Sequence, residues 1–246
     1  MAELLRIRSL TAGYHDNPVA VDVSLTVGDA AIVALLGPNG AGKSTVLKAL
    51  VGEARVFSGS VTLRGEDVTG TSPERLAKKG LGYVPQSDNV FPSLSVLENL
   101  EMGAFLVPRR RVRERVDAIL GEFPALRGLL RREVSRLSGG ERRLVAIGRA
   151  LVLSPAVLLL DEPTANLSPI NARRVLTEYV AQVAAGGTGV LLVEQRAKEA
   201  LEVAHHACVL SGGRLEVSGS PKSLLERDDM GRLFLGEAAH KTALEG

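Results

Sequence analysis

The segment Gly37–Ser44, which reads Gly-Pro-Asn-Gly-Ala-Gly-Lys-Ser, constrains the fold of this chain more than any other feature. It follows a continuous apolar run at Ala30–Leu36, typical of a strand buried on both faces, and opens a helical pattern over roughly Lys43–Gly52. Glycines let successive backbone N–H groups turn inward, and the helix N-terminus adds a favourable dipole. A chance glycine-rich turn would lack this strand–loop–helix context. The sequence therefore predicts an α/β fold built around a phosphate-binding loop.

The positions inside this loop have distinct expected roles toward a nucleotide. Lys43 supplies a mobile positive charge to the β- and γ-phosphates, and the Ser44 hydroxyl is a predicted ligand of Mg²⁺, with Thr45 directly behind it. ATP and Mg²⁺ are therefore the predicted cofactors. The residues expected to bind the nucleotide here are Gly37, Pro38, Asn39, Gly40, Ala41, Gly42, Lys43, Ser44 and Thr45.

A second apolar run, Ala156–Leu160, leads into two acids, Asp161 and Glu162, followed by Pro163. Ionised groups are costly to bury without partners, and a Mg²⁺ ion and a lysine would compensate. Because side chains alternate along an extended chain, the two carboxylates should point differently. We predict that Asp161 binds Mg²⁺, through water, and that Glu162 is the general base or the orienter of the attacking water. The alternative, a charged loop start, is disfavoured by the phosphate-binding loop upstream.

The motif that decides the class is Leu137–Glu141, which reads Leu-Ser-Gly-Gly-Glu and precedes the helical spacing of Arg142–Leu151. Phosphate loop and acid pair alone are typical of P-loop NTPases, whereas this motif resembles the LSGGQ signature of ABC ATPases. In that family the signature reaches across a dimer to the γ-phosphate held by the other subunit, and a helix N-terminus with glycine amides suits an anion. The resemblance implies nucleotide contacts from Ser138, Gly139, Gly140 and Glu141. A second Ser-Gly-Gly, Ser211–Gly213, is predicted to be only a hairpin turn.

Other positions resemble the same family over nearly the whole chain. Tyr14 resembles the aromatic residue that stacks on adenine, although a turn tyrosine is the alternative. Gln86 resembles the Q-loop glutamine, which contacts Mg²⁺ or water and marks the joint to a helical subdomain. Thr164–Ser168 resembles the D-loop at the dimer interface. Gln195, after the apolar run Val190–Val193, stands where the family usually has its switch histidine. The resemblance thus implies Glu162, Gln195 and Gln86 as catalytic residues, and Ser44, Gln86 and Asp161 as the metal site.

Three departures from the family pattern bear on activity. Gln195 replaces the histidine, Glu141 replaces the signature glutamine, and Ser168-Pro169 replaces the usual D-loop aspartate. Gln195 can donate a hydrogen bond to a γ-phosphate but cannot carry a charge, so weakened or asymmetric hydrolysis is one expectation.

One branch of the family resembles this chain more closely. The shared segments are Val193–Gln195, Phe91–Leu100, Leu167–Ile170 and Phe234–Gly236. This LivF-like branch serves bacterial uptake of branched-chain amino acids, and its relatives take up urea and short amides. The resemblance therefore implies the ATP-hydrolysing subunit of an importer for branched-chain or other hydrophobic amino acids.

The organisation expected is one ABC ATPase domain over 1–246. A core with a largely parallel sheet would comprise 1–86 and 151–237, a helical subdomain about 87–150, and a flexible tail 238–246. Short strands at Leu4–Arg8 and Ala20–Val27, separated by a turn region at Gly13–Pro18, would form an antiparallel side sheet. Further strands are expected at Val61–Leu63, Gly80–Val84 and Val190–Val193, and a hairpin at Ala207–Leu210 and Arg214–Val217.

Bulk properties restrict the partners. The formal net charge of +2 gives no electrostatic argument for nucleic acid, and no apolar run reaches the roughly 18 residues of a spanning helix. The N-terminal residues predict no signal peptide, so membrane association is expected through transmembrane permease subunits, at the cytoplasmic face of the inner membrane. The single cysteine, Cys208, fits a reducing compartment and core packing. The arginine run 109–115 suits a solvated helix face or contact with lipid or permease.

The resemblance implies a head-to-tail dimer with a copy or a homologue, in which each ATP lies between one phosphate-binding loop and the opposite signature. Two rivals stay open: an ABC ATPase of DNA repair or translation, and a weakly hydrolysing regulatory subunit that mainly binds ATP. The first usually carries coiled-coil insertions or tandem cassettes, which this sequence lacks. A small-molecule P-loop kinase is disfavoured by the signature. The four histidines, His15, His205, His206 and His240, lack metal-ligand spacing.

Overall fold

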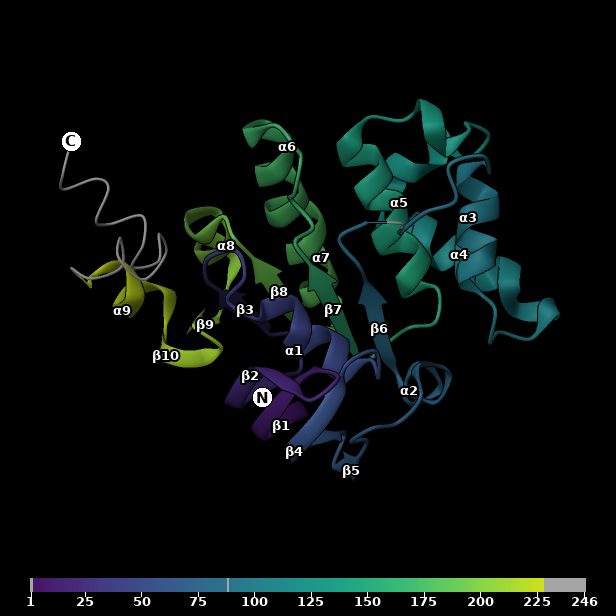
Figure 1. Ribbon diagram of the computed structural model, residues 1–246. Coiled ribbons are helices and arrows are strands. Elements are labelled where there is room, and N and C mark those ends of the chain that lie inside the picture. Colours follow the sequence, from purple (N-terminus) through teal and green to yellow (C-terminus); the bar gives the residue numbers. More distant parts are fainter. Residues whose placement is uncertain (1, 88, 228–246) are drawn as a thin grey trace.

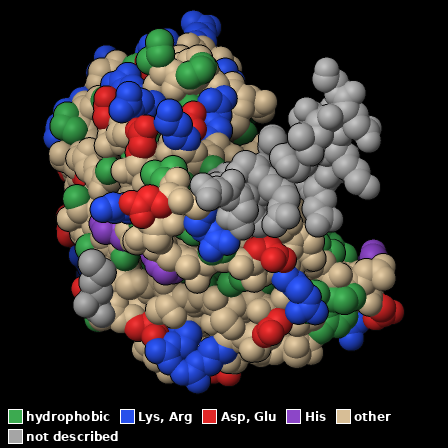
Figure 2. Space-filling model, turned by 90° about the vertical axis from the view of Figure 1, so that its left-hand side faces the viewer, with side chains coloured by type: hydrophobic (Ala, Val, Ile, Leu, Met, Phe, Trp, Pro, Cys, Tyr) green, Lys and Arg blue, Asp and Glu red, His purple; other side chains and the backbone are tan. Residues whose placement is uncertain are grey.

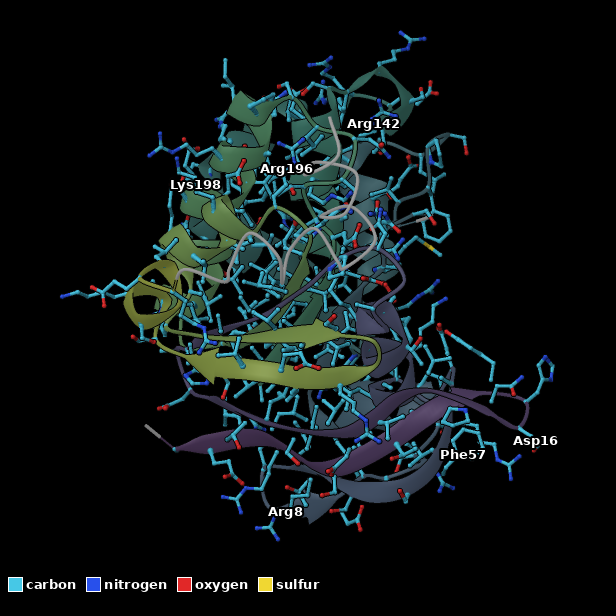
Figure 3. The ribbon with its side chains drawn as sticks, turned by 60° about the vertical axis from the view of Figure 1, so that its left-hand side comes forward. Arg8, Asp16, Phe57, Arg142, Arg196 and Lys198 are labelled. Atoms are coloured by element: carbon cyan, nitrogen blue, oxygen red, sulfur yellow. The ribbon has the colours of Figure 1, made fainter. Side chains whose placement is uncertain are left out.

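Two β-sheets and the helices around them make up the computed structural model, which describes residues 2–87 and 89–227 (Figure 1). The antiparallel sheet lies at the bottom of Figure 1, and a group of helices stands at the upper right. In Figure 3 Arg8, Asp16 and Phe57 mark the antiparallel sheet, whereas Arg142, Arg196 and Lys198 mark the helical end of the molecule. Within the described ranges, no helix combines the length and the hydropathy needed to cross a membrane.

The antiparallel sheet has the order β2-β1-β4-β5 and confirms the predicted side sheet. Its strands are β1 (Glu3–Tyr14), β2 (Asn17–Gly28), β4 (Arg55–Leu63) and β5 (Glu66–Asp67). The predicted turn region Gly13–Pro18 was wrong in its extent, because Gly13 pairs with Pro18 and Tyr14 with Asn17. The turn is only His15-Asp16, and His15 takes a left-handed φ of 53°. Alternating buried and exposed side chains therefore continue as strand well beyond the predicted ends.

The second sheet has six strands in the order β10-β9-β3-β8-β7-β6. Its neighbours are parallel except for the antiparallel pair β9 and β10, so the predicted parallel sheet and the hairpin are both confirmed. The strands are β3 (Ile32–Leu36), β6 (Leu81–Val84), β7 (Val157–Asp161), β8 (Gly189–Glu194), β9 (His206–Ser211) and β10 (Arg214–Gly219). Every residue of β3, β7 and β8 is buried, which explains why these strands are apolar up to the acids that end β7 and β8.

Helices cover both faces of the parallel sheet. They are α1 (Lys43–Leu50), α2 (Pro73–Lys79), α3 (Val96–Gly103), α4 (Arg109–Glu122), η1 (Pro124–Leu129), η2 (Val134–Arg136), α5 (Gly139–Leu151), α6 (Pro169–Arg174), the π-helical η3 (Val175–Val180), α7 (Ala181–Ala185), α8 (Ala197–Val203) and α9 (Pro221–Leu225). Side chains of β3 divide between two cores: Ile32 and Leu36 pack toward α5 and η3, and Val33 packs toward α1 and the antiparallel sheet.

The predicted helical stretch 87–150 holds α3, α4, η1, η2 and most of α5, and its described residues form no strand beyond an isolated bridge between Ser95 and Glu133. The division into a core and a helical subdomain stays a prediction, because one apolar core joins α3 and α5 to the sheet. The predicted tail 238–246 and the segment Phe234–Gly236 lie outside the described residues.

Candidate active site

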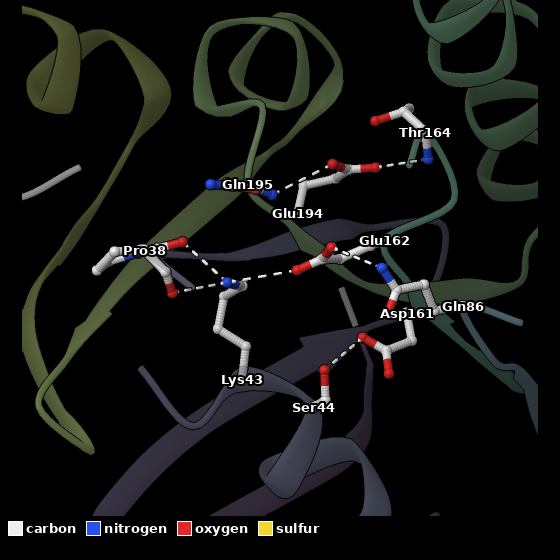
Figure 4. Close-up of polar contacts among 10 residues, drawn as sticks. Pro38, Lys43, Ser44, Gln86, Asp161, Glu162, Thr164, Glu194 and Gln195 are labelled. Atoms are coloured by element: carbon white, nitrogen blue, oxygen red, sulfur yellow. Dashed lines mark hydrogen bonds and ion pairs between the residues drawn. The ribbon is translucent and has the colours of Figure 1, made fainter. Parts of the chain in front are cut away.

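Four neighbouring parallel strands bring the predicted site residues to one edge of the sheet. In the order β3, β8, β7, β6, their carboxyl ends lead into Gly37, Gln195, Glu162 and Gln86, respectively. Segments distant in sequence meet because the carboxyl ends of parallel strands lie at the same edge, where α/β folds commonly bind ligands. Figure 4 shows the polar contacts that result.

The phosphate-binding loop is shaped by glycine and closed by Lys43. Gly37 has φ 149°, and a Cβ there would lie 2.1 Å from the carbonyl oxygen of Leu210, so no other residue fits. Lys43, only 4% exposed, begins α1. Its Nζ donates to the carbonyl oxygens of Gly37 (2.9 Å) and Pro38 (3.0 Å) and lies 3.5 Å from a carboxylate oxygen of Glu162. The ammonium is thus held at the mouth of the loop, where a phosphate would compete for it.

Ser44 and Asp161 form the second contact of the site. The Ser44 hydroxyl donates to Oδ1 of Asp161 over 2.9 Å. Asp161 ends β7 and is 3% exposed; burial raises the pKa of its carboxyl, and the bond from Ser44 opposes that shift. A hydroxyl and a carboxylate side by side beneath the loop are oxygen ligands of the kind Mg²⁺ prefers, so the residues fit the predicted metal.

Glu162 points away from Asp161 and toward Lys43 and Gln86. Nε2 of Gln86 donates to Oε2 of Glu162 over 3.1 Å, while Lys43 faces Oε1. Glu162 has a left-handed φ of 44°, which is uncommon for a residue with a side chain, and its N–H donates to the carbonyl oxygen of Val193. The backbone at this position is therefore fixed by β8, and the carboxylate is held by two groups from two other segments.

A cavity of about 300 Å³ lies beside these groups. Gln195 lines it together with Glu162 and Gln86, so the structure places all three predicted catalytic residues around one space. The lining residues are Asn39, Gln86, Glu162, Thr164, Ala165, Asn166, Glu194, Gln195 and Arg196. A water between Glu162 and Gln195 would face groups that can accept and donate hydrogen bonds.

Glu194, the last residue of β8, had no predicted role. Its side chain is 1% exposed, and its carboxylate accepts hydrogen bonds from the backbone N–H groups of Thr164 (2.9 Å) and Gln195 (3.2 Å). Burial raises the pKa of this carboxyl, against the lowering effect of the hydrogen bonds from Thr164. The sequence contained the signal for this role, because Glu194, like Asp161, is an acid at the end of a buried apolar strand, and such an acid needs partners.

Arg143 also received no prediction. It lies on α5, is 8% exposed, and its guanidinium reaches the carbonyl oxygen of Gln86 at 3.4 Å. Gln86, the predicted joint after β6, therefore contacts α5, the helix that begins in the signature motif. The sequence contained a signal for Arg143, because it stands among the apolar positions of this helix, where a charged side chain needs partners.

Tyr14 lies at the end of β1 and is 38% exposed. Its ring is 5.9 Å from Nζ of Lys48, on α1, so it stands beside the helix that follows the phosphate-binding loop. Its predicted stacking on adenine stays a prediction. Nδ1 of His205 accepts a hydrogen bond from the backbone N–H of Ile32. Cys208 is buried in β9, in agreement with its predicted core packing.

The signature motif forms the start of α5. The Ser138 hydroxyl accepts from the N–H of Glu141 at 3.3 Å, and the Glu141 carboxylate accepts from the N–H of Ser138 at 2.7 Å, a reciprocal capping box. This cap starts the helix at Gly139, three residues before the spacing predicted it. The pKa of Glu141 is lowered chiefly by the Ser138 backbone bond. A glutamine could cap in the same way, so helix capping accounts for Glu141 at this position.

Signature and phosphate-binding loop stay apart within the chain. Among the residues described, no hydrogen bond or ion pair joins Ser138–Glu141 to Gly37–Thr45. Gly139 instead packs against the turn after Glu162, since a Cβ on it would lie 2.7 Å from Cδ2 of Leu167. Within residues 2–87 and 89–227, the two predicted halves of the nucleotide site therefore make no direct polar contact with each other.

Known proteins match this chain over nearly its full length. Residues 20–165 match the protein family described as ABC transporter. A probable branched-chain amino acid transport ATP-binding protein, LivF of Archaeoglobus fulgidus, is 41% identical over 95% of this chain and 99% of its own length. BraG of Pseudomonas aeruginosa, a high-affinity branched-chain amino acid transport ATP-binding protein, is 39% identical over 87% of this chain and 92% of its own. The lipopolysaccharide export ATP-binding protein LptB of Haemophilus influenzae is 36% identical over 95% and 98%.

Solved structures agree with these relatives. An ATP-binding cassette of an ABC transporter in its ADP conformation superposes with a TM-score of 0.86 at 27% identity, covering 96% of this chain and all of that one. A nucleotide-free cassette gives a TM-score of 0.84 at 27% identity, over 95% and 99%. The predicted fold and the resemblance to LivF-like proteins are confirmed. Family, relatives and fold lead to one assignment: this chain belongs to the ABC transporter family, as an ATP-binding subunit that hydrolyses ATP for a transporter.

Proposed function

We propose that this subunit powers an importer of branched-chain or other hydrophobic amino acids from the cytoplasmic face of the membrane, with Mg²⁺ and ATP bound at the strand edge described above. The observation that supports the cargo is the identity of 39–41% to two branched-chain amino acid transport proteins. Export of lipopolysaccharide is the second candidate, favoured by a relative at 36% identity. Uptake of radiolabelled leucine into liposomes holding the subunit with its permeases tests the first; lipid extraction without leucine uptake would support the second.

The proposed chemistry follows from the contacts. Lys43 exchanges the carbonyl oxygens of its own loop for phosphate oxygens. Ser44 and Asp161 would hold Mg²⁺, which would neutralise charge on the phosphates. Glu162 accepts a proton from water or orients it, with its carboxylate fixed by Lys43 and Gln86. Gln195, which lines the same cavity, donates a hydrogen bond to the γ-phosphate.

The proposed assembly is a head-to-tail dimer with a copy or a homologue. Its support is the lack of any polar contact between Ser138–Glu141 and the phosphate-binding loop within the described residues, although each lies at the N-terminus of a helix. Only a second subunit would let both contact one nucleotide. ATP would then stabilise the closed dimer, because only that state makes both sets of contacts.

Contact with a permease is proposed at an apolar cavity of about 420 Å³ between α2, β6, α3 and α5. Phe91, Met102 and Phe105 line it and are 41%, 51% and 65% exposed, which is unusual for large apolar side chains. Pro85 and Asn89, which flank Gln86 in sequence, belong to the same lining. A short amphipathic helix of a permease suits such a cavity. Because Pro85 and Asn89 line the cavity, a movement of Gln86 would shift the surface that this helix contacts. By contrast, the visible part of the face in Figure 2 mixes both charges and has only small hydrophobic groups.

We expect Phe105→Asp to abolish co-purification with the permease subunits while the ATPase activity of the isolated subunit stays unchanged. A charge placed in an apolar contact costs several kcal/mol, whereas at 65% exposure it is tolerated by the free subunit. Leu225→Asp on α9, at 61% exposure, is the matched control and should co-purify normally. Normal recovery of permease with Phe105→Asp would place the docking surface elsewhere.

The arginine-rich helix α4 makes local contacts in the structure. Arg111 bonds to Glu114, Arg113 lies 3.9 Å from Asp117, and Arg115 donates to Ser154. These contacts fit the solvated-face interpretation, and contact with lipid or permease remains the alternative prediction.

Replacing Gln195 by histidine tests the regulatory alternative. We expect the wild-type protein to hydrolyse ATP and Gln195→His to retain that activity, because the glutamine amide already supplies a hydrogen-bond donor in the cavity. Steady-state ATPase assays, run alone and with permease subunits, measure both. If the wild-type protein binds ATP without hydrolysing it, and Gln195→His restores turnover, the chain is instead a regulatory ATP-binding subunit.

A further inference from the structure

Two residues on either side of Gln195, Glu194 and Arg196, contact the turn Thr164–Leu167 at its two ends. Glu194 accepts from the Thr164 N–H at 2.9 Å, and Nη2 of Arg196 donates to the Leu167 carbonyl oxygen at 3.1 Å. The turn also closes on itself through a 3.2 Å bond from the Leu167 N–H to the Thr164 carbonyl oxygen. In Figure 4 the Glu194 carboxylate lies between the backbone nitrogens of Thr164 and Gln195.

The contact at the first end is buried and charged. Glu194 is 1% exposed and Thr164 is fully buried, so the backbone N–H there could not turn to water if the carboxylate were lost. One carboxylate oxygen serves Thr164 and the other serves Gln195, and both bonds are charge-assisted. Glutamine at this position has one acceptor oxygen and would set its NH₂ group against one of the two backbone N–H groups.

The contact at the second end fixes the turn next to the signature motif. Asn166 takes a left-handed φ of 61°, which a short amide side chain tolerates, and the chain then passes through Leu167. Leu167 packs against Gly139, where an added Cβ would lie 2.7 Å away. Arg196 holds the carbonyl oxygen of the same Leu167 and also lies 3.8 Å from Glu199. A shift of Arg196 would therefore move Leu167, which contacts Gly139 in the signature motif.

We propose that Glu194 and Arg196 are positioning residues that lock the turn Thr164–Leu167 to Gln195 on one side and to Gly139 on the other. Any displacement of Gln195, which lines the cavity with Glu162, is carried to the turn by the shared carboxylate of Glu194. Arg196 and Leu167 carry it on to the start of α5. The two residues act through Gln195 and the turn. This inference rests on the proposed dimer, in which the signature binds the nucleotide held by the second subunit.

The first test separates positioning from folding by steady-state kinetics. We expect Glu194→Gln to lower kcat by about 10- to 100-fold, the effect of losing a buried charge-assisted bond, with KM for ATP unchanged. Arg196→Met, at a side chain that is 34% exposed, should lower kcat in the same direction without loss of fold. Glu199→Gln removes only the ion pair of Arg196, and Glu216→Gln changes an exposed carboxylate on β10; both should behave as wild type. Wild-type kcat in Glu194→Gln and Arg196→Met would overturn the proposal.

The second test uses the dimer trapped by Glu162→Gln and keeps the two proposals apart. With ATP and Mg²⁺, Glu162→Gln alone should elute as a dimer in size-exclusion chromatography. Adding Glu194→Gln or Arg196→Met should reduce the dimer fraction, while a fluorescent ATP analogue still binds the monomer. An undiminished dimer in both double variants overturns the positioning role. Absence of the dimer already in Glu162→Gln would instead contradict the proposed assembly on which the inference rests.

Discussion

Glutamine in place of Glu162 is expected to abolish steady-state ATP hydrolysis while ATP binding survives. The carboxylate is held by Nζ of Lys43 and Nε2 of Gln86, on separate oxygens. An amide of the same shape can accept from one of these donors, turns its NH₂ group toward the other, and cannot take a proton from water. Loss of general-base catalysis costs about 100- to 10,000-fold in turnover. The left-handed φ of 44° is tolerated equally by either side chain, so the fold should be unaffected.

The measurement is a coupled ATPase assay together with equilibrium binding of a fluorescent ATP analogue. ATP should accumulate on the variant and drive it into the closed dimer, because hydrolysis no longer removes the γ-phosphate. Glu216→Gln, on the exposed side of β10, is the matched control and should turn over normally. Unchanged turnover in Glu162→Gln would refute the role assigned to this residue.

Alanine in place of Lys43 is expected to remove most of the affinity for ATP. Lys43 is 4% exposed, and its ammonium is held by two carbonyl oxygens and one carboxylate at the phosphate-binding loop. Hydrogen bonds to charged groups contribute about 1.5–3 kcal/mol each, so losing those made to the β- and γ-phosphates weakens binding by at least about tenfold. Turnover should become undetectable at concentrations that saturate the wild type.

Isothermal titration with ATP and Mg²⁺ measures this affinity, and thermal unfolding without nucleotide checks the fold. We expect little change in Tm, because removing a positive charge from the N-terminus of α1 relieves a repulsion with the helix dipole and offsets the lost carbonyl contacts. Lys78→Ala, at an exposed lysine of α2 paired with Glu74, is the control and should bind ATP normally. Wild-type affinity in Lys43→Ala would exclude the loop as the phosphate site.

Local pattern was sufficient for the elements that carry the chemistry. A fully buried parallel strand must be apolar on both faces, so β3, β7 and β8 could be read directly from the sequence. The acids at the end of β7 and the glycine loop after β3 follow from the same reading, since each breaks an apolar run at a position where polar groups need partners. The long hairpin of β1 and β2 was underestimated, because its solvent-facing positions carry polar residues that resemble a turn.

Contacts between distant segments were beyond any local pattern. The sequence placed Gln86 and Glu162 in the same site by family resemblance, yet their 3.1 Å bond exists because β6 and β7 are neighbours in the sheet. Glu194 meets Thr164 for a similar reason, since β8 pairs with β7. The capping role of Glu141 needed the observed start of α5.

Sequence by itself thus determined which residues could bind phosphate, metal and water, because residue type and spacing along one strand or loop are local properties. Only the tertiary structure decided which of them face one another, which polar groups are buried, and that the signature lies apart from the loop it is predicted to complete. The physical reason is that strand order, not the apolar periodicity of any strand, sets these distances.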